Sequence, residues 1–228
     1  MGAITYQREP ARRGAYRLET WWGRAFLRAV EEAAYDDAQL AGARSLARSG
    51  RIGGIVVDRG TFAAAVDAED GLWTVTGTVP VVDAESVSAL VEVLPGDPAR
   101  VDAVLAGQLP HDLVEHAEEA GVELVPYGGE LAATCTCRHW HDVCSHALAV
   151  LHQAAWLVDR DAQVLLHLRG VPREDLLARL RQVPPSAAGL RAGGDGAVGG
   201  LDTEPVGEPD SVEIAIDAAL RARRLLAE

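Results

Sequence analysis

Residues 52–82 read IGGIVVDRGTFAAAVDAEDGLWTVTGTVPVV and carry the clearest strand pattern of the chain. Residues 52–57 are rich in β-branched side chains, and apolar and polar residues alternate over residues 73–81, as on a strand with one buried face. Gly60 and Gly71 each follow charged residues at points where the chain can turn. The stretch therefore predicts a three-stranded antiparallel meander with a threonine-rich face exposed to solvent.

Helical patterns flank this sheet on both sides. From Thr20 to Ser49, apolar pairs recur every four residues, beginning with Trp21 and Trp22, and Ser49-Gly50 is a stop signal. We interpret the two tryptophans as core anchors, because aromatic residues at helical spacing usually pack in the interior. After the sheet, the patterns predict helices over residues 84–94, 98–107, 111–120, 145–158, 161–168 and 173–183, with extended chain over residues 122–127 and 130–137.

All three cysteines fall in the segment CTCRHWHDVCSH, residues 135–146. An odd and clustered set does not suit a disulfide framework and indicates a metal site. Cys135 and Cys137 are two residues apart on extended chain, so their sulfurs can point to the same side. Cys144 and His146 lie where a loop enters a helix, whose N-terminus favours ionised sulfur. Three thiolates and one imidazole predict tetrahedral Zn²⁺ with no position left for water, which is typical of a structural site.

Other interpretations of this segment stay open at the level of the sequence. His139 or His141 could replace His146 as the fourth ligand. The cysteines could also be small buried side chains without a metal. A cysteine nucleophile beside a histidine is a further alternative, although a metal would compete for the nucleophile.

The formal net charge of −13 is spread unevenly along the chain. Every basic residue is an arginine, and Arg100 is the single one between residues 61 and 134. Proteins that bind nucleic acid through its phosphates usually carry a basic total charge, so this balance argues against strong DNA binding. The first residues lack the apolar core of a secretory signal, and no apolar run is long enough to span a membrane, so we expect a cytoplasmic protein.

The pattern Cys135-x-Cys137 followed by Cys144-x-His146 resembles the SWIM zinc fingers. Trp140, residues 21–23, residues 47–51 and residues 166–170 extend the similarity to stand-alone actinobacterial SWIM proteins, over about residues 16–183. The resemblance implies Zn²⁺ binding and a role in contacts with DNA or protein. It also implies, as a candidate partner, a helicase-like ATPase of the Swi/Snf type. Ser145 stands where members often carry a basic residue, which favours a protein partner.

Together these patterns predict an α+β fold with an N-terminal helical arm, a small antiparallel sheet and helices around a zinc knuckle. The predicted parts are the arm over 1–50, the meander and helices over 51–134, the finger with its following helices over 135–183, a flexible linker over 184–210 and a C-terminal helix over 211–228. The linker is rich in Pro, Gly and Ala, a composition that buries little surface.

Three functions are carried forward from the sequence. The first is a non-catalytic zinc module that mediates protein–protein interaction. The second is a nucleic-acid binder, and the third is an enzyme with a cysteine nucleophile. The chain has no lysine and no phosphate-binding loop of an ATPase. The arginines that a nucleic-acid binder would use are Arg138, Arg173 and Arg179, with Arg160, Arg169 and Arg181 in support.

Overall fold

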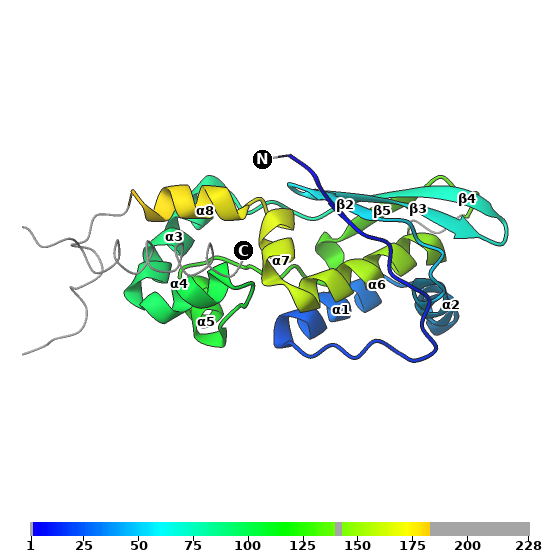
Figure 1. Ribbon diagram of the computed structural model, residues 1–228, viewed down its shortest axis with the longest axis horizontal. Coiled ribbons are helices and arrows are strands. Elements are labelled where there is room, and N and C mark those ends of the chain that lie inside the picture. The colour runs from blue at the N-terminus through cyan, green and yellow to red at the C-terminus, as the bar shows by residue number, and fades with distance from the viewer. Residues whose placement is uncertain (1, 140–142, 183–228) are drawn as a thin grey trace, which may run out of the picture.

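The computed structural model describes residues 2–139 and 143–182. Within them, a five-stranded antiparallel sheet lies against a layer of helices (Figure 1). The α+β class predicted from the sequence is confirmed. The linker predicted over 184–210 and the helix predicted over 211–228 lie outside the described residues. The strands are β1 (Ile4–Tyr6), β2 (Ile55–Asp58), β3 (Thr61–Ala68), β4 (Gly71–Thr78) and β5 (Ala132–Cys135), paired in chain order.

The predicted meander forms the centre of the sheet as β2, β3 and β4. Two further strands form the edges of the sheet. The sequence patterns do not assign either of them to it. β1 is a three-residue strand in a polar segment, and β5 joins β4 from a distant part of the chain, with Thr134 opposite Thr76. Thr74, Thr76 and Thr78 are exposed, as predicted. Gly77 has to be glycine, because a Cβ there would lie 2.1 Å from the Cζ atom of Phe62.

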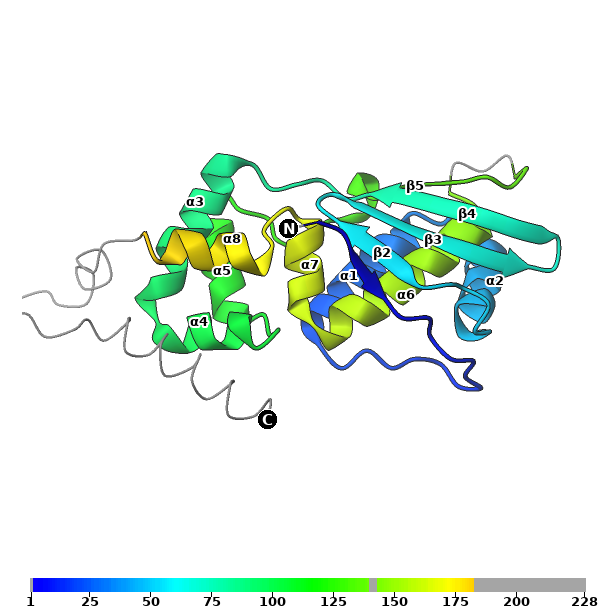
Figure 2. The ribbon, with the colours of Figure 1, turned by 45° about the horizontal axis from the view of Figure 1, so that its top comes forward.

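The helices lie on one side of the sheet and at one end of it (Figures 1 and 2). α1, α2 and α6 run beneath the strands, α3, α4, α5 and α8 gather at the other end of the molecule, and α7 lies between. None of the helices in the described ranges is long and apolar enough to cross a membrane. Their bounds are α1 (Trp21–Glu32), α2 (Asp37–Arg48), α3 (Ala84–Val93), α4 (Pro98–Leu105), α5 (His111–Glu119), α6 (Ser145–Arg160), α7 (Ala162–Leu168) and α8 (Arg173–Leu180).

Two sequence expectations need correction here. The helical pattern over residues 20–49 is two helices, because Asp36 accepts a hydrogen bond from the backbone N–H of Gln39 and so begins a new helix at α2. Residues 122–127, all of them described, contain no strand. They run past α7 as a loop, with Val122 and Leu124 buried in the core.

The central helix α6 holds the N-terminal part of the chain through Asp159. This buried carboxylate accepts hydrogen bonds from the N–H and hydroxyl of Thr20, at 2.8 and 2.7 Å, and from the N–H of Glu19 and the hydroxyl of Tyr16, both at 3.2 Å. A Cβ on Gly23 would lie 2.5 Å from its Oδ1 atom. Asp159 thus positions Thr20, the N-cap residue of α1, whose hydroxyl accepts from the N–H of Gly23 at 3.1 Å.

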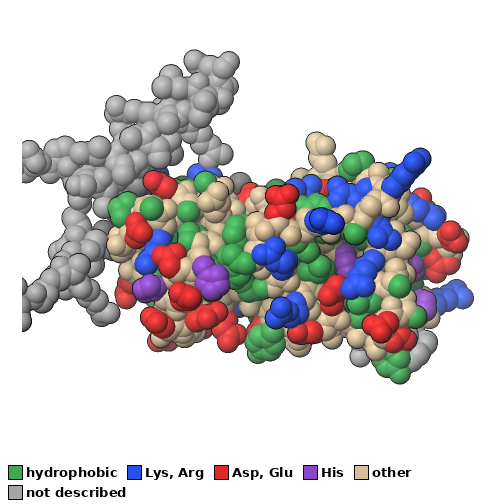
Figure 3. Space-filling model, turned by 90° about the horizontal axis from the view of Figure 1, so that it is seen from below, with side chains coloured by type: hydrophobic (Ala, Val, Ile, Leu, Met, Phe, Trp, Pro, Cys, Tyr) green, Lys and Arg blue, Asp and Glu red, His purple; other side chains and the backbone are tan. Residues whose placement is uncertain are grey.

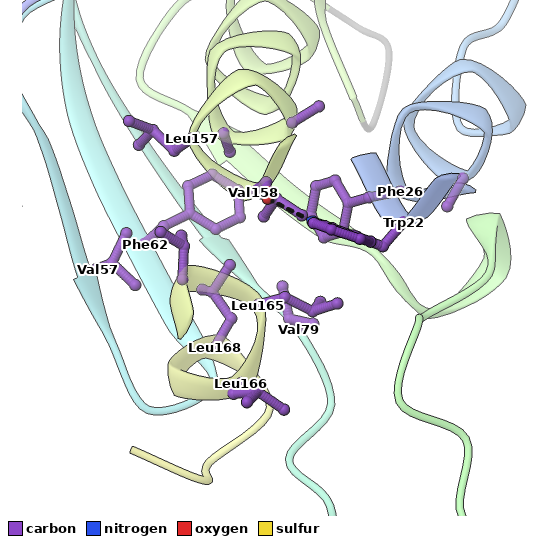
Figure 4. Packing of buried hydrophobic residues seen from close by; sticks show 14 of the residues in the cluster. Trp22, Phe26, Val57, Phe62, Val79, Leu157, Val158, Leu165, Leu166 and Leu168 are labelled. Atoms are coloured by element: carbon purple, nitrogen blue, oxygen red, sulfur yellow. Dashed lines mark hydrogen bonds between the residues drawn. The ribbon is translucent and has the colours of Figure 1, made fainter. Parts of the chain in front are cut away.

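The tryptophans at the start of α1 are core anchors, as predicted. Trp22 is buried, and its Nε1 donates to the carbonyl of Val158 at 2.9 Å (Figure 4). Trp21 is half-buried and donates to the carbonyl of Leu109 at 3.0 Å. Around Trp22, residues from α1, β3 and α7 converge on one core, among them Phe26, Phe62 and Leu165 (Figure 4).

Candidate metal centre

Cys135 and Cys137 are presented by an extension of the edge strand. Cys135 is the last residue of β5, and Thr136 continues the pairing with β4. The N–H of Thr136 donates to the carbonyl of Thr74 at 3.0 Å, and the Thr136 hydroxyl accepts from the N–H of Thr74 at 3.0 Å. The N–H and the hydroxyl of Thr136 are both hydrogen-bonded to Thr74. The cysteines on either side of Thr136 are therefore held on an extended backbone.

Cys144 and His146 are presented by the start of α6. Cys144 is the N-cap residue, and His146 lies in the first turn. The loop before the helix is held from α2, because the Gln39 side-chain amide donates to the carbonyl of Val143 at 2.7 Å. No pattern in the sequence pointed to Gln39, since a single side-chain contact between distant segments leaves no local signal.

The four predicted ligands come together at one point. Their donor atoms, three sulfurs and one imidazole nitrogen, lie within 4.8 Å of one another. Cys137 Sγ lies 3.5 Å from Cys144 Sγ, and Cys135 Sγ lies 3.9 Å from His146 Nδ1. A tetrahedron with metal bonds of ~2.0–2.3 Å has edges of roughly 3.5–3.8 Å, so both the spacing and the chemistry of the donors fit Zn²⁺. His139 is exposed and is not one of these four, and His141 lies outside the described residues.

Burial shifts the pKa values of three of the predicted ligands. It raises the pKa of Cys135 to about 12, and it also raises the pKa of Cys144. Backbone N–H groups at the start of α6 lower the pKa of Cys144, but burial has the larger effect. The helix N-terminus thus acts on Cys144 in the predicted direction, toward ionised sulfur, and a bound metal ion would add positive charge beside the buried thiols. Burial also lowers the pKa of His146, which favours the neutral imidazole that a metal requires.

Comparison with known proteins agrees with this geometry. The family described as SWIM zinc finger matches residues 120–155. This segment is a SWIM zinc finger. Zinc is the cofactor of the SWIM finger, as predicted.

Over 200 residues, the chain is 29% identical to uncharacterized protein Rv2102 of Mycobacterium tuberculosis, covering 86% of this chain and 68% of that protein. The chain is thus similar to an actinobacterial protein well beyond the finger. No solved structure matches it.

The SWIM finger is built into the fold and is not an appendage. Its strand, β5, is an edge of the sheet, and its helix, α6, packs against α1, α2 and α7 as well as β3, β4 and β5. Every residue of α6 from His146 to Asp159 is buried. The metal site therefore joins the sheet to the helix on which the N-terminal segment is assembled.

The arginines that the sequence nominated for nucleic-acid binding are not brought together. Arg138 is exposed within the SWIM finger, whereas Arg173 and Arg179 lie on α8, at the other end of the molecule (Figure 2). Arg160 forms an ion pair with the buried Glu9. Arg181 is exposed just after α8.

Arg169 has a structural role, and the prediction that it contacts phosphate is wrong. Its side chain is 5% exposed, and its two terminal nitrogens donate to the carbonyls of Pro80 and Glu123 at 2.6 and 2.7 Å. These bonds tie the end of α7 to the segment after β4 and to the loop before β5. Burial lowers the pKa of Arg169, with nearby carboxylates acting in the opposite direction.

We expect Arg169→Met to lower the free energy of unfolding by about 2–4 kcal/mol, because two buried carbonyls lose charged donors. Urea denaturation of the zinc-loaded protein measures this change. Arg181→Met removes the same charge from an exposed position and should change stability by less than about 0.5 kcal/mol. Equal stability of the two variants would contradict the structural role of Arg169.

Proposed function

We propose that the chain is a non-catalytic protein-interaction module in which Cys135, Cys137, Cys144 and His146 hold Zn²⁺. The observation that carries the proposal is the closed set of four protein donors around one point, which leaves no coordination position for water or a substrate. The raised pKa values of Cys135 and Cys144 further disfavour a cysteine nucleophile. In this proposal the metal fastens β5 to α6 and so supports the exposed face of the sheet.

That face supports interaction with a protein partner. Among the described residues, the helices lie on the opposite side of the sheet (Figure 1). The open face has a shallow hollow lined mainly by small side chains, including Ala63, Thr76 and Thr134, which would admit side chains of a partner. The net charge of −13 opposes a polyanionic partner. A helicase-like ATPase is the candidate partner that the family resemblance suggests.

The experiment is capture of partners from the native cytoplasm by the zinc-loaded chain. Thr76→Arg places a charged side chain in the hollow and is expected to abolish capture while zinc content is unchanged. Ala178→Arg adds the same charge on the exposed side of α8 and should leave capture intact. Capture that persists in Thr76→Arg would place the contact elsewhere, and an ATPase that is lost with Cys137→Ser would support the candidate partner.

Nucleic-acid binding is the second candidate, supported by a different arginine set from the one nominated by the sequence. On the face formed by the N-terminal segment, α1 and α2, basic side chains gather at one end, whereas acidic side chains gather over α4 and α5 (Figure 3). The exposed arginines of this region include Arg13, Arg17 and Arg28. Such a local patch supports weak binding of phosphates at low salt.

We expect weak binding of duplex and single-stranded DNA at low salt and little binding near 0.15 M, where charges are screened beyond about 8 Å. A fluorescence titration at several salt concentrations measures this. Changing Arg13, Arg17 and Arg28 to Glu should abolish the low-salt binding. The same change at Arg138, Arg173 and Arg179 should reduce it less, because those side chains do not share a face. Sub-micromolar binding at 0.15 M with a steep salt dependence would promote this candidate over the protein-interaction module.

A further inference from the structure

The outer side of His146 faces the tip of the β3–β4 hairpin. Its Nδ1 atom points toward the sulfurs, 3.9 Å from Cys135 Sγ, whereas its Nε2 atom lies 3.6 Å from the Oδ1 atom of Asp70. The two ring nitrogens thus have different neighbours, a cluster of thiols on one side and a carboxylate on the other. Asp70 belongs to the turn between two strands of the sheet and lies far from His146 in the sequence.

Trp73 holds this arrangement together. Its Nε1 donates to the same Oδ1 atom of Asp70 at 3.0 Å, and its ring is stacked on the imidazole of His146, with centroids 6.2 Å apart and planes 28° from parallel. Gly71 turns the hairpin with a φ of 147°, and a Cβ there would lie 3.0 Å from the Trp73 ring. Carboxylate, indole and imidazole are therefore positioned by one tight turn.

We propose that Asp70 and Trp73 are positioning residues for the zinc site. The negative charge of the Asp70 carboxylate, 3.6 Å from Nε2, favours the tautomer of His146 that keeps its proton on Nε2 and turns the Nδ1 lone pair to the metal. Trp73 fixes both the carboxylate and the plane of the imidazole. Partners of this kind orient metal-binding histidines, and their loss typically weakens metal affinity by about 10–100-fold. The inference rests on the ligand set proposed above and adds the hairpin tip to the SWIM finger as its outer support.

The first test is zinc affinity of the full chain, measured by competition with a chromophoric chelator. Asp70→Ala is expected to weaken affinity by about 10–100-fold. Asp70→Asn should keep most of the wild-type affinity, because the amide oxygen still accepts from the indole and still presents an acceptor to Nε2. Trp73→Phe keeps a stacked ring but lacks the N–H donor. Its zinc affinity should lie between those of Asp70→Ala and the wild type. Glu69→Ala removes the neighbouring carboxylate, whose side chain is 96% exposed, and should bind zinc like the wild type.

The second test is the protonation state of His146, read from the ¹⁵N and ¹H resonances of its ring in the zinc-loaded protein. Wild type and Asp70→Asn should show metal on Nδ1 and a slowly exchanging proton on Nε2. In Asp70→Ala that proton should exchange rapidly with water, a change that a purely structural role of Asp70 would not produce.

The outcomes separate this inference from the proposed function. Wild-type zinc affinity and a slowly exchanging Nε2 proton in Asp70→Ala would overturn the role of Asp70 alone. Zinc bound through Nε2 in the wild type would overturn it as well. A folded wild type that takes up no zinc would overturn the ligand set and, with it, this inference.

Discussion

Cys144→Ala is expected to abolish zinc binding and to lower the free energy of unfolding by about 4 kcal/mol or more, since loss of a metal is among the largest single effects. Structural zinc has an apparent value of about 10–16 kcal/mol in peptides that have no other core. Here the sheet has a large apolar core as well, so we expect the loss to be confined to the finger and the helix that follows it. Hydrogen exchange should become faster around residues 130–160, whereas β2, β3 and β4 should stay protected.

Elemental analysis provides the metal content, and one zinc per chain is expected for the wild type. Ser145→Ala is the matched control, because it changes the residue between the two C-terminal ligands and leaves all four donors in place. A wild-type protein that is folded but contains no metal would contradict the zinc assignment. Uniform loss of protection in Cys144→Ala would instead show that the metal holds the whole fold.

The second large effect is expected at Asp159, far from the metal along α6. Asp159→Ala should lower the free energy of unfolding by about 3–5 kcal/mol, because the donors of Tyr16, Glu19 and Thr20 lose a buried acceptor together. Asp159→Asn retains one oxygen and should cost about 1–2 kcal/mol. Urea denaturation of the zinc-loaded variants measures both.

Asp102→Ala removes an exposed carboxylate on α4 and should be close to neutral. A further readout is Trp22, whose indole bonds to the carbonyl beside Asp159 and whose fluorescence should report the loosening of α1. If Asp159→Ala were as stable as the wild type, water would replace the carboxylate. Asp159 would then not be needed to hold the N-terminal segment.

Both effects have their origin in one feature, the placement of the SWIM finger inside the core. The helix that Cys144 caps ends with Asp159 and Arg160, which hold the N-terminal segment. A metal at the start of α6 and a carboxylate near its end therefore stabilise different parts of the same helix. Since the two sites lie well apart and share no partner, we expect their effects on stability to be nearly additive.

Features that depend on neighbouring residues can be predicted from the sequence alone. The Cys-x-Cys and Cys-x-His spacings indicate the ligands, because residues two apart on extended chain share a side and a helix start can present two near neighbours. Alternation over residues 73–81 predicts β4, because every second side chain faces the core. The helix patterns after the sheet likewise follow from local periodicity, and Trp22 is identified as a core residue by its spacing.

Contacts between distant segments become visible in the folded structure and not in the sequence. β5 becomes a sheet edge because Thr136 bonds to Thr74, and Asp70 meets His146 because the hairpin tip reaches the start of α6. Arg169 is of a residue type that often binds phosphate, but here it is buried and donates to two carbonyls. In each case the side chain is polar and could have been solvated. Its partner is a backbone group or side chain far away in the sequence, so its role follows from packing and leaves no periodic signal.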